Sequence, residues 1–434
     1  MIVAPPSYFD SVGAILREVP VATWQAYLAY NLVSAYAPYS PYSPFVAEDF
    51  AFEQHMLRGV PEIQPRRKRA VATVDRLVSF ALGRLYVERY FPLACKDRAD
   101  AMIAHLMDAY RESIATLDWM GPETRRQALD KLAAIRPMIG YPVTWRDYTA
   151  LVVRRDDLVG NVMRARGFDY NFWLAKLGGE VDRPEWHSPP QTINAFYSPS
   201  RNAIVFPAGI LQQPFLDAGA DDAANYGAIG TVIGHEISHA FDDQGSRFDG
   251  EGNLRNWWTE EDRSRFDGKT CSLIAQCDAF SPLPGYQVNG ALTLGENVAD
   301  NAGLAIAERA YRLSLGGCAA PVIDGYTGAQ RLFISSAQIW RDMTRCAMRR
   351  ASSGSRWTRT RRASSAPTEA CAIRVPSTAR STSSRAMRCV CRRSSGYRRG
   401  GSTARWCAKR RPASAMPFRY GRAGKGLLAG ARIC

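Results

Sequence analysis

The stretch that decides the fold is NYGAIGTVIGHEISHAFDD, residues 225–243. Its apolar residues follow a helical pattern, and its polar residues gather on one face. His235, Glu236 and His239 form the segment HEISH, in which the two histidines are four positions apart and share a helix face. Two imidazoles so placed can bind one zinc ion, and the adjacent glutamate can act as general base on a zinc-bound water. Two ordinary surface histidines are the alternative, but the chain has only five histidines in all.

A catalytic zinc site needs a third protein ligand, and a candidate lies downstream. The segment ALTLGENVADNAG, residues 291–303, places Glu296 and Asp300 four positions apart. Glu296 is the candidate ligand, and Asp300 is a candidate hydrogen-bond partner for a ligating imidazole. Two acids at this spacing more often form a solvated helix face, so the prediction depends on the HEISH segment upstream.

The composition divides the chain in two. Its 434 residues, 46% of them hydrophobic, suit two or three globular domains. The net charge of +15 comes from residues 346–434, which contain 22 Lys and Arg and one acid, whereas residues 1–345 carry a net charge of −6. The segment 346–434 holds only seven Leu, Ile, Val and Phe residues, too few to bury a core. We therefore predict a folded body followed by a disordered tail.

The body is predicted to be mostly helical. Apolar residues three and four apart indicate helices over 8–19, 21–36, 68–91 and 98–117. A break at Gly121, Pro122 at a first-turn position and the good helix formers that follow indicate a further helix over 122–135. A Pro-, Gly- and Trp-rich stretch at 136–148 interrupts this pattern, and the alternating, β-branched run at 202–207 predicts a strand. No apolar run is long enough to span a membrane, and the first twenty residues lack the pattern of a signal peptide.

Three segments, in this order, resemble the neprilysin and endothelin-converting-enzyme family of zinc metalloendopeptidases, in its bacterial branch. They are NAFYSPSRNAIVFPAGILQQPF (194–215), VIGHEISHAFDDQGSRFDGEGNLRNWWT (232–259) and LTLGENVADNAGLAIA (292–307). The likeness covers most of residues 1–345 and begins inside the family's larger region, so we expect the chain to be N-terminally incomplete.

The resemblance implies a mainly α fold with a small β portion, in which a helical domain covers a thermolysin-like zincin catalytic domain. Residues 1–150 would belong to the helical N-terminal peptidase region, and residues 151–345 would form the zinc catalytic domain. We expect peptide substrates cut on the amino side of hydrophobic residues, and no nucleic-acid partner. Family members are usually exported or membrane-anchored with the catalytic domain facing outward, but this chain alone leaves its location open.

The resemblance also implies roles for single residues. His235, His239 and Glu296 would bind one Zn²⁺ per chain, Glu236 would be the general base, and Asp300 would orient His235. The residues expected to contact substrate are Asn194 and Ala195, through the peptide backbone, and Ile210, Phe215, Val232 and Trp340, as the lining of a hydrophobic pocket. From the sequence pattern alone, ordinary core packing explains the last four better, so their assignment rests on the resemblance.

The chain departs from the family after about residue 345. Relatives carry a histidine in an Asp-Pro-His-Ser/Ala-Pro motif near the C-terminus that stabilises the oxyanion, but no histidine follows His239 here. When WTRTRR (357–362) is back-translated with CGN codons for arginine and read in another frame, the codons permit Asp, Pro, His, Ser or Ala, and Pro. We therefore expect 346–434 to be an out-of-frame tail and the activity of this chain to be impaired.

Two other functions are compatible with the sequence. The chain could be a catalytically dead zinc-binding remnant, although the intact Glu236 argues against this. Alternatively, the Arg- and Ser-rich tail could bind nucleic acid through its positive charge.

Overall fold

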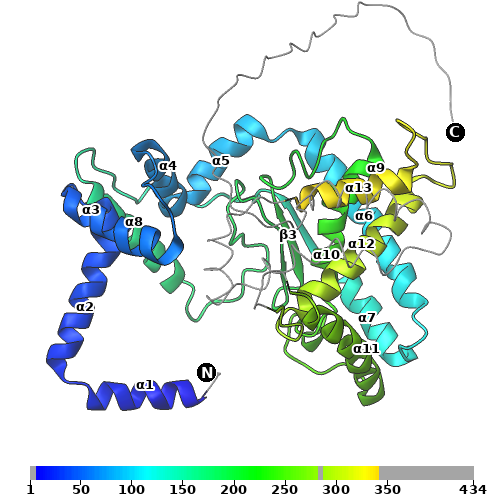
Figure 1. Ribbon diagram of the computed structural model, residues 1–434, viewed down its shortest axis with the longest axis horizontal. Coiled ribbons are helices and arrows are strands. Elements are labelled where there is room, and N and C mark those ends of the chain that lie inside the picture. The colour runs from blue at the N-terminus through cyan, green and yellow to red at the C-terminus, as the bar shows by residue number, and fades with distance from the viewer. Residues whose placement is uncertain (1–5, 282–286, 342–434) are drawn as a thin grey trace, which may run out of the picture.

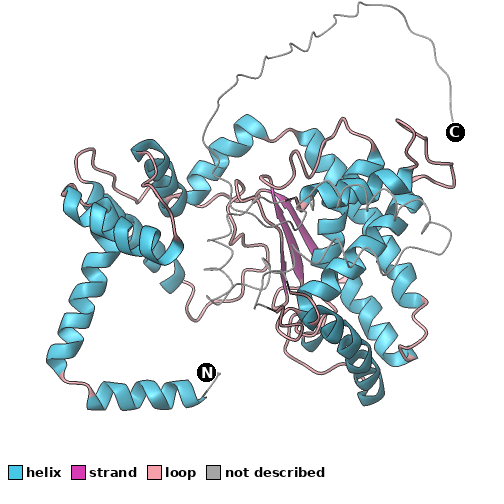
Figure 2. Ribbon diagram, in the orientation of Figure 1, coloured by secondary structure: helices cyan, strands magenta, loops and turns pink. Residues whose placement is uncertain are grey.

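Helices surround one small β-sheet in the computed structural model, which describes residues 6–281 and 287–341. Figure 2 shows helices over most of the described chain and the three strands near its centre. The predicted fold class, mainly α with a small β portion, is confirmed. The predicted tail, 346–434, lies outside the described residues.

Helical elements occupy the chain up to the first strand (Figure 1). Helix α7 begins where the sequence places it, with Pro122 in the first turn, where a missing amide is tolerated, and with Glu123 beside it. The elements are α1 (Pro6–Glu18), α2 (Val21–Tyr36), η1 (Ala37–Tyr39), α3 (Ser43–Asp49), η2 (Phe50–Met56), α4 (Arg66–Leu77), α5 (Ser79–Tyr90), α6 (Leu93–Ala115) and α7 (Pro122–Ala133).

The later helices alternate with loops, and several begin at side-chain caps. The hydroxyl of Thr259 accepts from the amide of Asp262 at the start of α11, and Thr327 forms a reciprocal capping box with Gln330 at the start of α13. The elements are α8 (Leu158–Leu174), α9 (Asp222–Asn225), η3 (Tyr226–Gly230), α10 (Thr231–Ser238), η4 (Gly245–Arg247), α11 (Glu260–Asp278), α12 (Leu294–Ser314) and α13 (Gly328–Ile339).

The sheet has the strand order β1-β3-β2. Strand β3 (Ala203–Pro207), which the alternating run predicts, is buried throughout and pairs in parallel with β1 (Arg136–Gly140). Strand β2 (Phe196–Ser198) pairs antiparallel with β3 and contacts α10. The sequence pattern identified neither β1 nor β2. Strand β1 lies inside the Pro- and Gly-rich break, and β2 is too short to show alternation.

The pattern over 68–91 predicts one helix, but the chain forms two, α4 and α5. They meet at Val78, whose φ of −134° and ψ of 45° lie outside the helical region. The side-chain nitrogen Nε2 of Gln191 donates to the carboxylate of Asp75 at 2.6 Å and to the backbone carbonyl of Ser79 at 3.0 Å. A loop more than a hundred residues away thus holds both sides of the break, which a local apolar pattern cannot indicate.

One hydrophobic cluster holds together elements from Phe91 to Leu332. It joins α6 and α7 to β3, α10 and α12, with Leu106, Phe206 and Ile233 among its fully buried side chains. Helices α6 and α7 belong to the predicted N-terminal region, whereas α10 and α12 belong to the predicted catalytic domain. The division at residue 150 stays a prediction.

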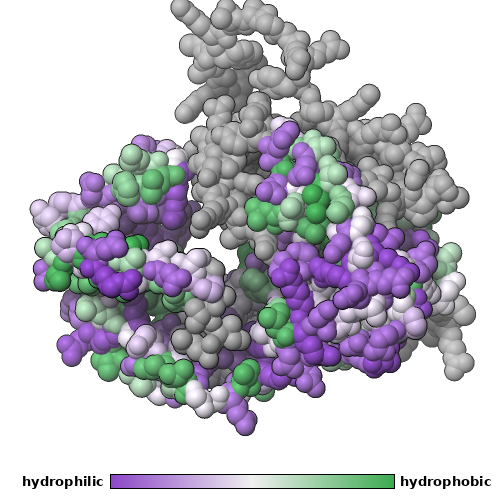
Figure 3. Space-filling view, turned by 90° about the horizontal axis from the view of Figure 1, so that it is seen from below, coloured by the Kyte–Doolittle hydropathy of each residue, from purple (hydrophilic) through white to green (hydrophobic). Residues whose placement is uncertain are grey.

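The N-terminal helices have a different surface. Neither α1 nor α2 has a buried residue, and large apolar side chains such as Phe9, Leu16 and Leu28 are exposed. Figure 1 shows both helices extending away from the sheet, and Figure 3 shows hydrophobic residues at the surface of this part. Among the described residues, no helix combines the length and apolar character needed to cross a bilayer.

Candidate metal centre

Helix α10 carries the HEISH segment and is buried along its whole length. All eight of its residues are buried, including His235, Glu236 and Ser238. His239 follows at the C-cap with helical backbone angles, and its amide donates to the carbonyl of His235 at 3.2 Å. The two histidines therefore keep the one-turn spacing that the sequence predicts, and both lie on the side of the helix that faces α12.

A pair of glycines lets α12 approach α10 closely. A Cβ atom on Gly234 would lie 2.7 Å from the carbonyl oxygen of Gly303, and one on Gly303 would lie 2.6 Å from the amide nitrogen of His235. Both distances are too short for any side chain, so the two helix backbones are in contact here. This contact brings Glu296 and Asp300, on the first turns of α12, next to the two histidines.

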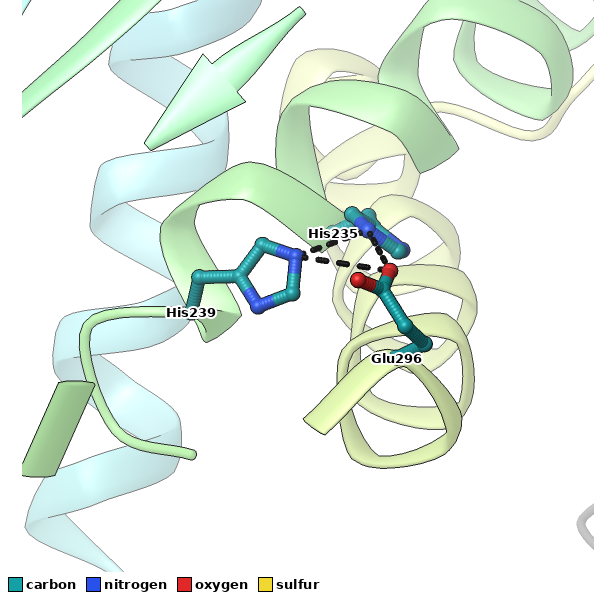
Figure 4. A group of neighbouring side chains, drawn as sticks. All are labelled: His235, His239 and Glu296. Atoms are coloured by element: carbon teal, nitrogen blue, oxygen red, sulfur yellow. Dashed lines mark hydrogen bonds and ion pairs between the residues drawn. The ribbon is translucent and has the colours of Figure 1, made fainter. Parts of the chain in front are cut away.

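The structure brings His235, His239 and Glu296 together (Figure 4). Their ligand atoms lie within 4.8 Å of one another. The Nε2 atoms of His235 and His239 are 2.9 Å apart, and Oε2 of Glu296 lies 3.3 Å from the first and 3.7 Å from the second. Two ligand atoms about 2 Å from a tetrahedral zinc ion are about 3.3 Å apart, which falls inside this range.

Both imidazoles are fixed from behind by carboxylates. Nδ1 of His235 lies 2.9 Å from Asp300, and Nδ1 of His239 lies 2.7 Å from Asp242. With a proton on each Nδ1, the two neutral rings point their Nε2 lone pairs at each other, next to the buried Glu296 Oε2, which accepts no hydrogen bond of good geometry. Such a cluster of acceptors needs a cation or shared protons between its members. The residues therefore fit zinc.

The charges of these groups are strongly coupled. Burial alone would lower the pKa of His235, but the hydrogen bond to Asp300 and the nearby carboxylate of Glu296 raise it well above its usual value. His239 behaves in the same way, with Asp242 as the main group that raises its pKa. Burial would raise the pKa of Glu296, but the two histidines lower it. Without metal, the site therefore favours imidazolium beside carboxylate.

Glu236 is buried next to the ligands. It is 7% exposed, and burial raises the pKa of its carboxyl group against the opposing charges of His235 and His239. The backbone amide of Tyr197, in β2, hydrogen-bonds this carboxylate. The Glu236 side chain, on α10, thus contacts β2, the strand that follows Asn194 and Ala195.

The six predicted substrate-binding residues lie on several elements. Asn194 is exposed and Ala195 is buried, and both directly precede β2. Ile210 and Val232 belong to the main hydrophobic cluster, and Phe215 packs against it. Trp340 is half-buried at the C-cap of α13. Their roles toward a substrate stay predictions.

Sequence reasoning missed three residues that contact this site. Asp242 is the partner of His239, and its position three residues after the second histidine was an available signal. The hydroxyl of the buried Tyr110, on α6, donates to the carbonyl of Gly234 at 2.7 Å and contacts Ser238. The side-chain Nζ of Lys131, on α7, donates to the carbonyl of Ala240 in the turn that follows His239. Both come from helices distant in sequence, so no local pattern reveals them.

Two sequence models of peptidase family M13 match this chain, at residues 1–142 and at residues 194–361. The second match contains the whole metal cluster and the strands β2 and β3. Together the two matches cover most of the described chain, and they leave the region of α8 and the loop after it between them.

The chain also resembles individual proteins. It is 36% identical over 354 residues to endothelin-converting enzyme 1 of Bos taurus, covering 78% of this chain, and 40% identical over 309 residues to neprilysin-1 of Caenorhabditis elegans, covering 68%. Among solved structures, it is similar to the zinc metalloprotease ZMP1 of Mycobacterium tuberculosis in complex with an inhibitor. The TM-score is 0.80 and the identity 46%, over 86% of this chain and 57% of that one.

The matched part of the relatives is limited in length. The chain spans 46% of the bovine enzyme and 40% of the nematode neprilysin, so it corresponds to less than half of each. PepO of Lactobacillus rhamnosis gives a TM-score of 0.68 at 32% identity, over 76% of this chain and 51% of that one. Given the two family matches, these relatives and the ligand cluster, the chain belongs to peptidase family M13, the neprilysin and endothelin-converting-enzyme family of zinc metalloendopeptidases.

Proposed function

We propose that this chain carries the zinc centre of an endopeptidase that cleaves oligopeptides on the amino side of hydrophobic residues. The observation that carries the proposal is the convergence of three ligand atoms beside the buried Glu236. His235, His239 and Glu296 would hold the ion. Asp300 and Asp242 would fix the two imidazole rings through Nδ1.

When zinc is bound at this site, it supplies a Lewis acid for the scissile carbonyl and makes a water more acidic. Glu236 takes a proton from the attacking water and delivers it to the amine of the leaving group. Its raised pKa suits this role, because a carboxylate that holds a proton more readily than a free one can take the proton and then return it. The two carboxylates behind the histidines keep each Nδ1 protonated, which leaves each Nε2 free for the metal.

Asn194 and Ala195 would bind the backbone of an extended peptide, since they directly precede β2, which contacts α10. Ile210, Phe215, Val232 and Trp340 would line the pocket for the residue after the scissile bond. Placing an aromatic or large aliphatic side chain in an apolar pocket favours binding by about 1.5–3 kcal/mol. We therefore expect a preference of about 10- to 100-fold for Phe or Leu over Asp at that position.

We propose that turnover is low in this chain. No histidine follows His239, so the donor that the family uses for the oxyanion is absent from the sequence. Loss of one such donor typically slows turnover by about 100- to 1000-fold. For the whole protein we propose a location outside the cytoplasm, periplasmic, extracellular or anchored and facing outward, as the family resemblance implies.

The test uses internally quenched peptides that differ only in Phe, Leu or Asp after the scissile bond, with the zinc-loaded full chain and Glu236→Gln. Slow cleavage before Phe and Leu that disappears in Glu236→Gln, with zinc still bound, supports the proposal. Zinc binding without any cleavage, even after prolonged incubation, would instead identify a catalytically dead remnant. Near-normal rates that require Glu236 would contradict the proposed impairment.

A further inference from the structure

Lys131, on α7, is a buried lysine that has no carboxylate at salt-bridge distance within the described part of the chain. The side chain is 1% exposed and is among the largest fully buried side chains of the described residues. Its Nζ donates to three backbone carbonyls, those of Ala240 and Gly245 at 2.7 Å each and that of Phe248 at 2.6 Å. An ammonium has three N–H donors, so this arrangement uses all of them.

The three carbonyls belong to one segment, the turn 240–248 that follows His239. Asp242 organises this turn from within, because its Oδ1 accepts from the amides of Gln244 at 2.8 Å and Gly245 at 2.6 Å. Its other oxygen, Oδ2, lies 2.7 Å from Nδ1 of His239. The carboxylate that orients one metal ligand is therefore itself held by a turn, and Lys131 ties that turn to α7.

The backbone of Lys131 reaches the other side of the site. Its carbonyl accepts from the side-chain amide of Asn202 at 3.1 Å, and the side-chain oxygen of Asn202 accepts from the hydroxyl of Tyr197 at 3.0 Å. The amide of Tyr197 in turn contacts Glu236. One residue of α7 is thus linked both to the turn behind His239 and to the strand beside Glu236.

Burial of the Lys131 ammonium has a cost, and its hydrogen bonds to the turn offset that cost. Burying an ammonium is unfavourable, and burial lowers the pKa of Lys131 to about 7 against the opposing charges of Asp242 and Asp249. The rings of Tyr197, Phe241 and Trp257 lie about the ammonium at 5.7–6.0 Å. A methionine would fill this aromatic pocket, but it would leave three buried carbonyls without a donor.

We propose that Lys131 is a positioning residue for the metal centre, which holds the turn 240–248 so that Asp242 presents its carboxylate to His239. The inference rests on the proposed zinc peptidase function and adds to it a residue more than a hundred positions upstream of the ligands. Lys131 bonds the turn and not the three proposed ligands themselves. It acts through the turn.

The test compares Lys131→Met with Leu332→Ala. Leu332 is fully buried on α13, whose main contacts are with α9 and η3, so its loss lowers stability without touching the turn. Zinc affinity is measured by competition with a chelator, well below the unfolding temperature of both variants. We expect Lys131→Met to bind zinc about 10- to 100-fold more weakly, the range typical of groups that support metal ligands. Leu332→Ala should stay near wild type.

A double-mutant cycle tests the route of the effect. If Lys131 acts through Asp242, the loss of zinc affinity in Lys131→Met combined with Asp242→Ala is smaller than the two single losses together. Simple additivity, or equal zinc affinity in Lys131→Met and wild type, would overturn the proposal. If Lys131→Met fails to fold, Lys131→Gln keeps two N–H donors and is expected to lose part of the affinity.

Hydrogen exchange of the metal-free full chain separates this inference from the proposed function. We expect the amides of Gly245 and Ser246 to exchange faster in Lys131→Met than in wild type, and to be unchanged in Leu332→Ala. If the wild-type chain binds no zinc, the proposed zinc function fails. Faster exchange in Lys131→Met than in wild type would still show that Lys131 holds the turn. Unchanged exchange in Lys131→Met means that Lys131 does not hold the turn.

Discussion

The two histidines illustrate at the residue scale how a ligand set is prepared. Each ring uses Nδ1 to bond a carboxylate, so its Nε2 is left facing Glu296 and the other histidine. The chemistry of the site therefore depends on Asp300 and Asp242 as much as on the ligands themselves. Sequence reasoning found the first of these acids through its spacing from Glu296 and missed the second.

Replacing Asp300 should weaken metal binding without removing a ligand. In Asp300→Ala, Nδ1 of His235 loses its acceptor at 2.9 Å, and the ring is free to change tautomer. We expect zinc affinity to fall by about 10- to 100-fold, measured by chelator competition. The matched control is Asp267→Ala, an acid on α11 that pairs with Arg263 at the surface. An unchanged affinity in Asp300→Ala would show that His235 does not need this carboxylate.

Lys131 should make stability depend on pH in a defined window. Its pKa is lowered from 10.5 to about 7, so between these values the unfolded chain binds a proton that the folded chain does not. Stability relative to Lys131→Met should therefore rise as the pH increases from 7 to about 10, and the penalty of the buried charge is complete below pH 7.

Urea unfolding of the metal-free proteins at pH 6.5, 7.5, 8.5 and 9.5 measures this difference. Lys96→Met is the control, because it removes a lysine from a surface pair with Asp100, a kind of pair worth under about 1 kcal/mol. A stability difference between wild type and Lys131→Met that is constant across the pH series would refute the assignment of this titration to Lys131.

At the element scale, the site depends on how closely α10 and α12 pack. Gly303→Ala would place a Cβ 2.6 Å from the amide of His235 and force the helices apart. We expect a loss of stability of about 1–3 kcal/mol, together with weaker zinc binding. Gly268→Ala on α11 is the control, since nothing lies within 4 Å of the new Cβ and helix propensity favours alanine by about 1 kcal/mol. Urea unfolding with and without zinc distinguishes the two variants.

Elements also show what the sequence could and could not predict. Local signals located α7 from Pro122, and the alternating run located β3. The break at Val78 and the strand β1 depend on partners distant in the chain, Gln191 and β3, and have no local signature. For the site, spacing identified the ligands, whereas Tyr110 and Lys131 reach α10 and its turn through the tertiary fold alone.

At the scale of the whole molecule, burial is unevenly distributed. Helices α1 and α2 have no buried residues, whereas α6, α10 and α12 share the main cluster. Regions with few buried contacts open at low free energy. We therefore expect mild proteolysis to cut within α1 and α2 before it cuts any element from α6 to α13.

N-terminal sequencing of the fragments over time tests this order of cleavage. Zinc should slow the later cuts and leave the early ones unchanged, because the ligands lie on α10 and α12 and bound metal stabilises only the folded cluster. Simultaneous cleavage of α1 and α12 would mean that the described chain unfolds as one unit. Protection of α1 and α2 from the protease would mean that their apolar surface is covered in solution.

The complete burial of α10 has a consequence for the way its sequence can vary. A helix at a protein surface tolerates exchange on its outer side, and tolerance then rises and falls with the helical period. All eight residues of α10 are buried. Five of them are polar or glycine and already contact neighbouring groups: Thr231, Gly234, His235, Glu236 and Ser238. Random mutagenesis should therefore yield almost no functional variants along this segment. The number of tolerated substitutions should not rise and fall with the helical period, as it does in surface helices.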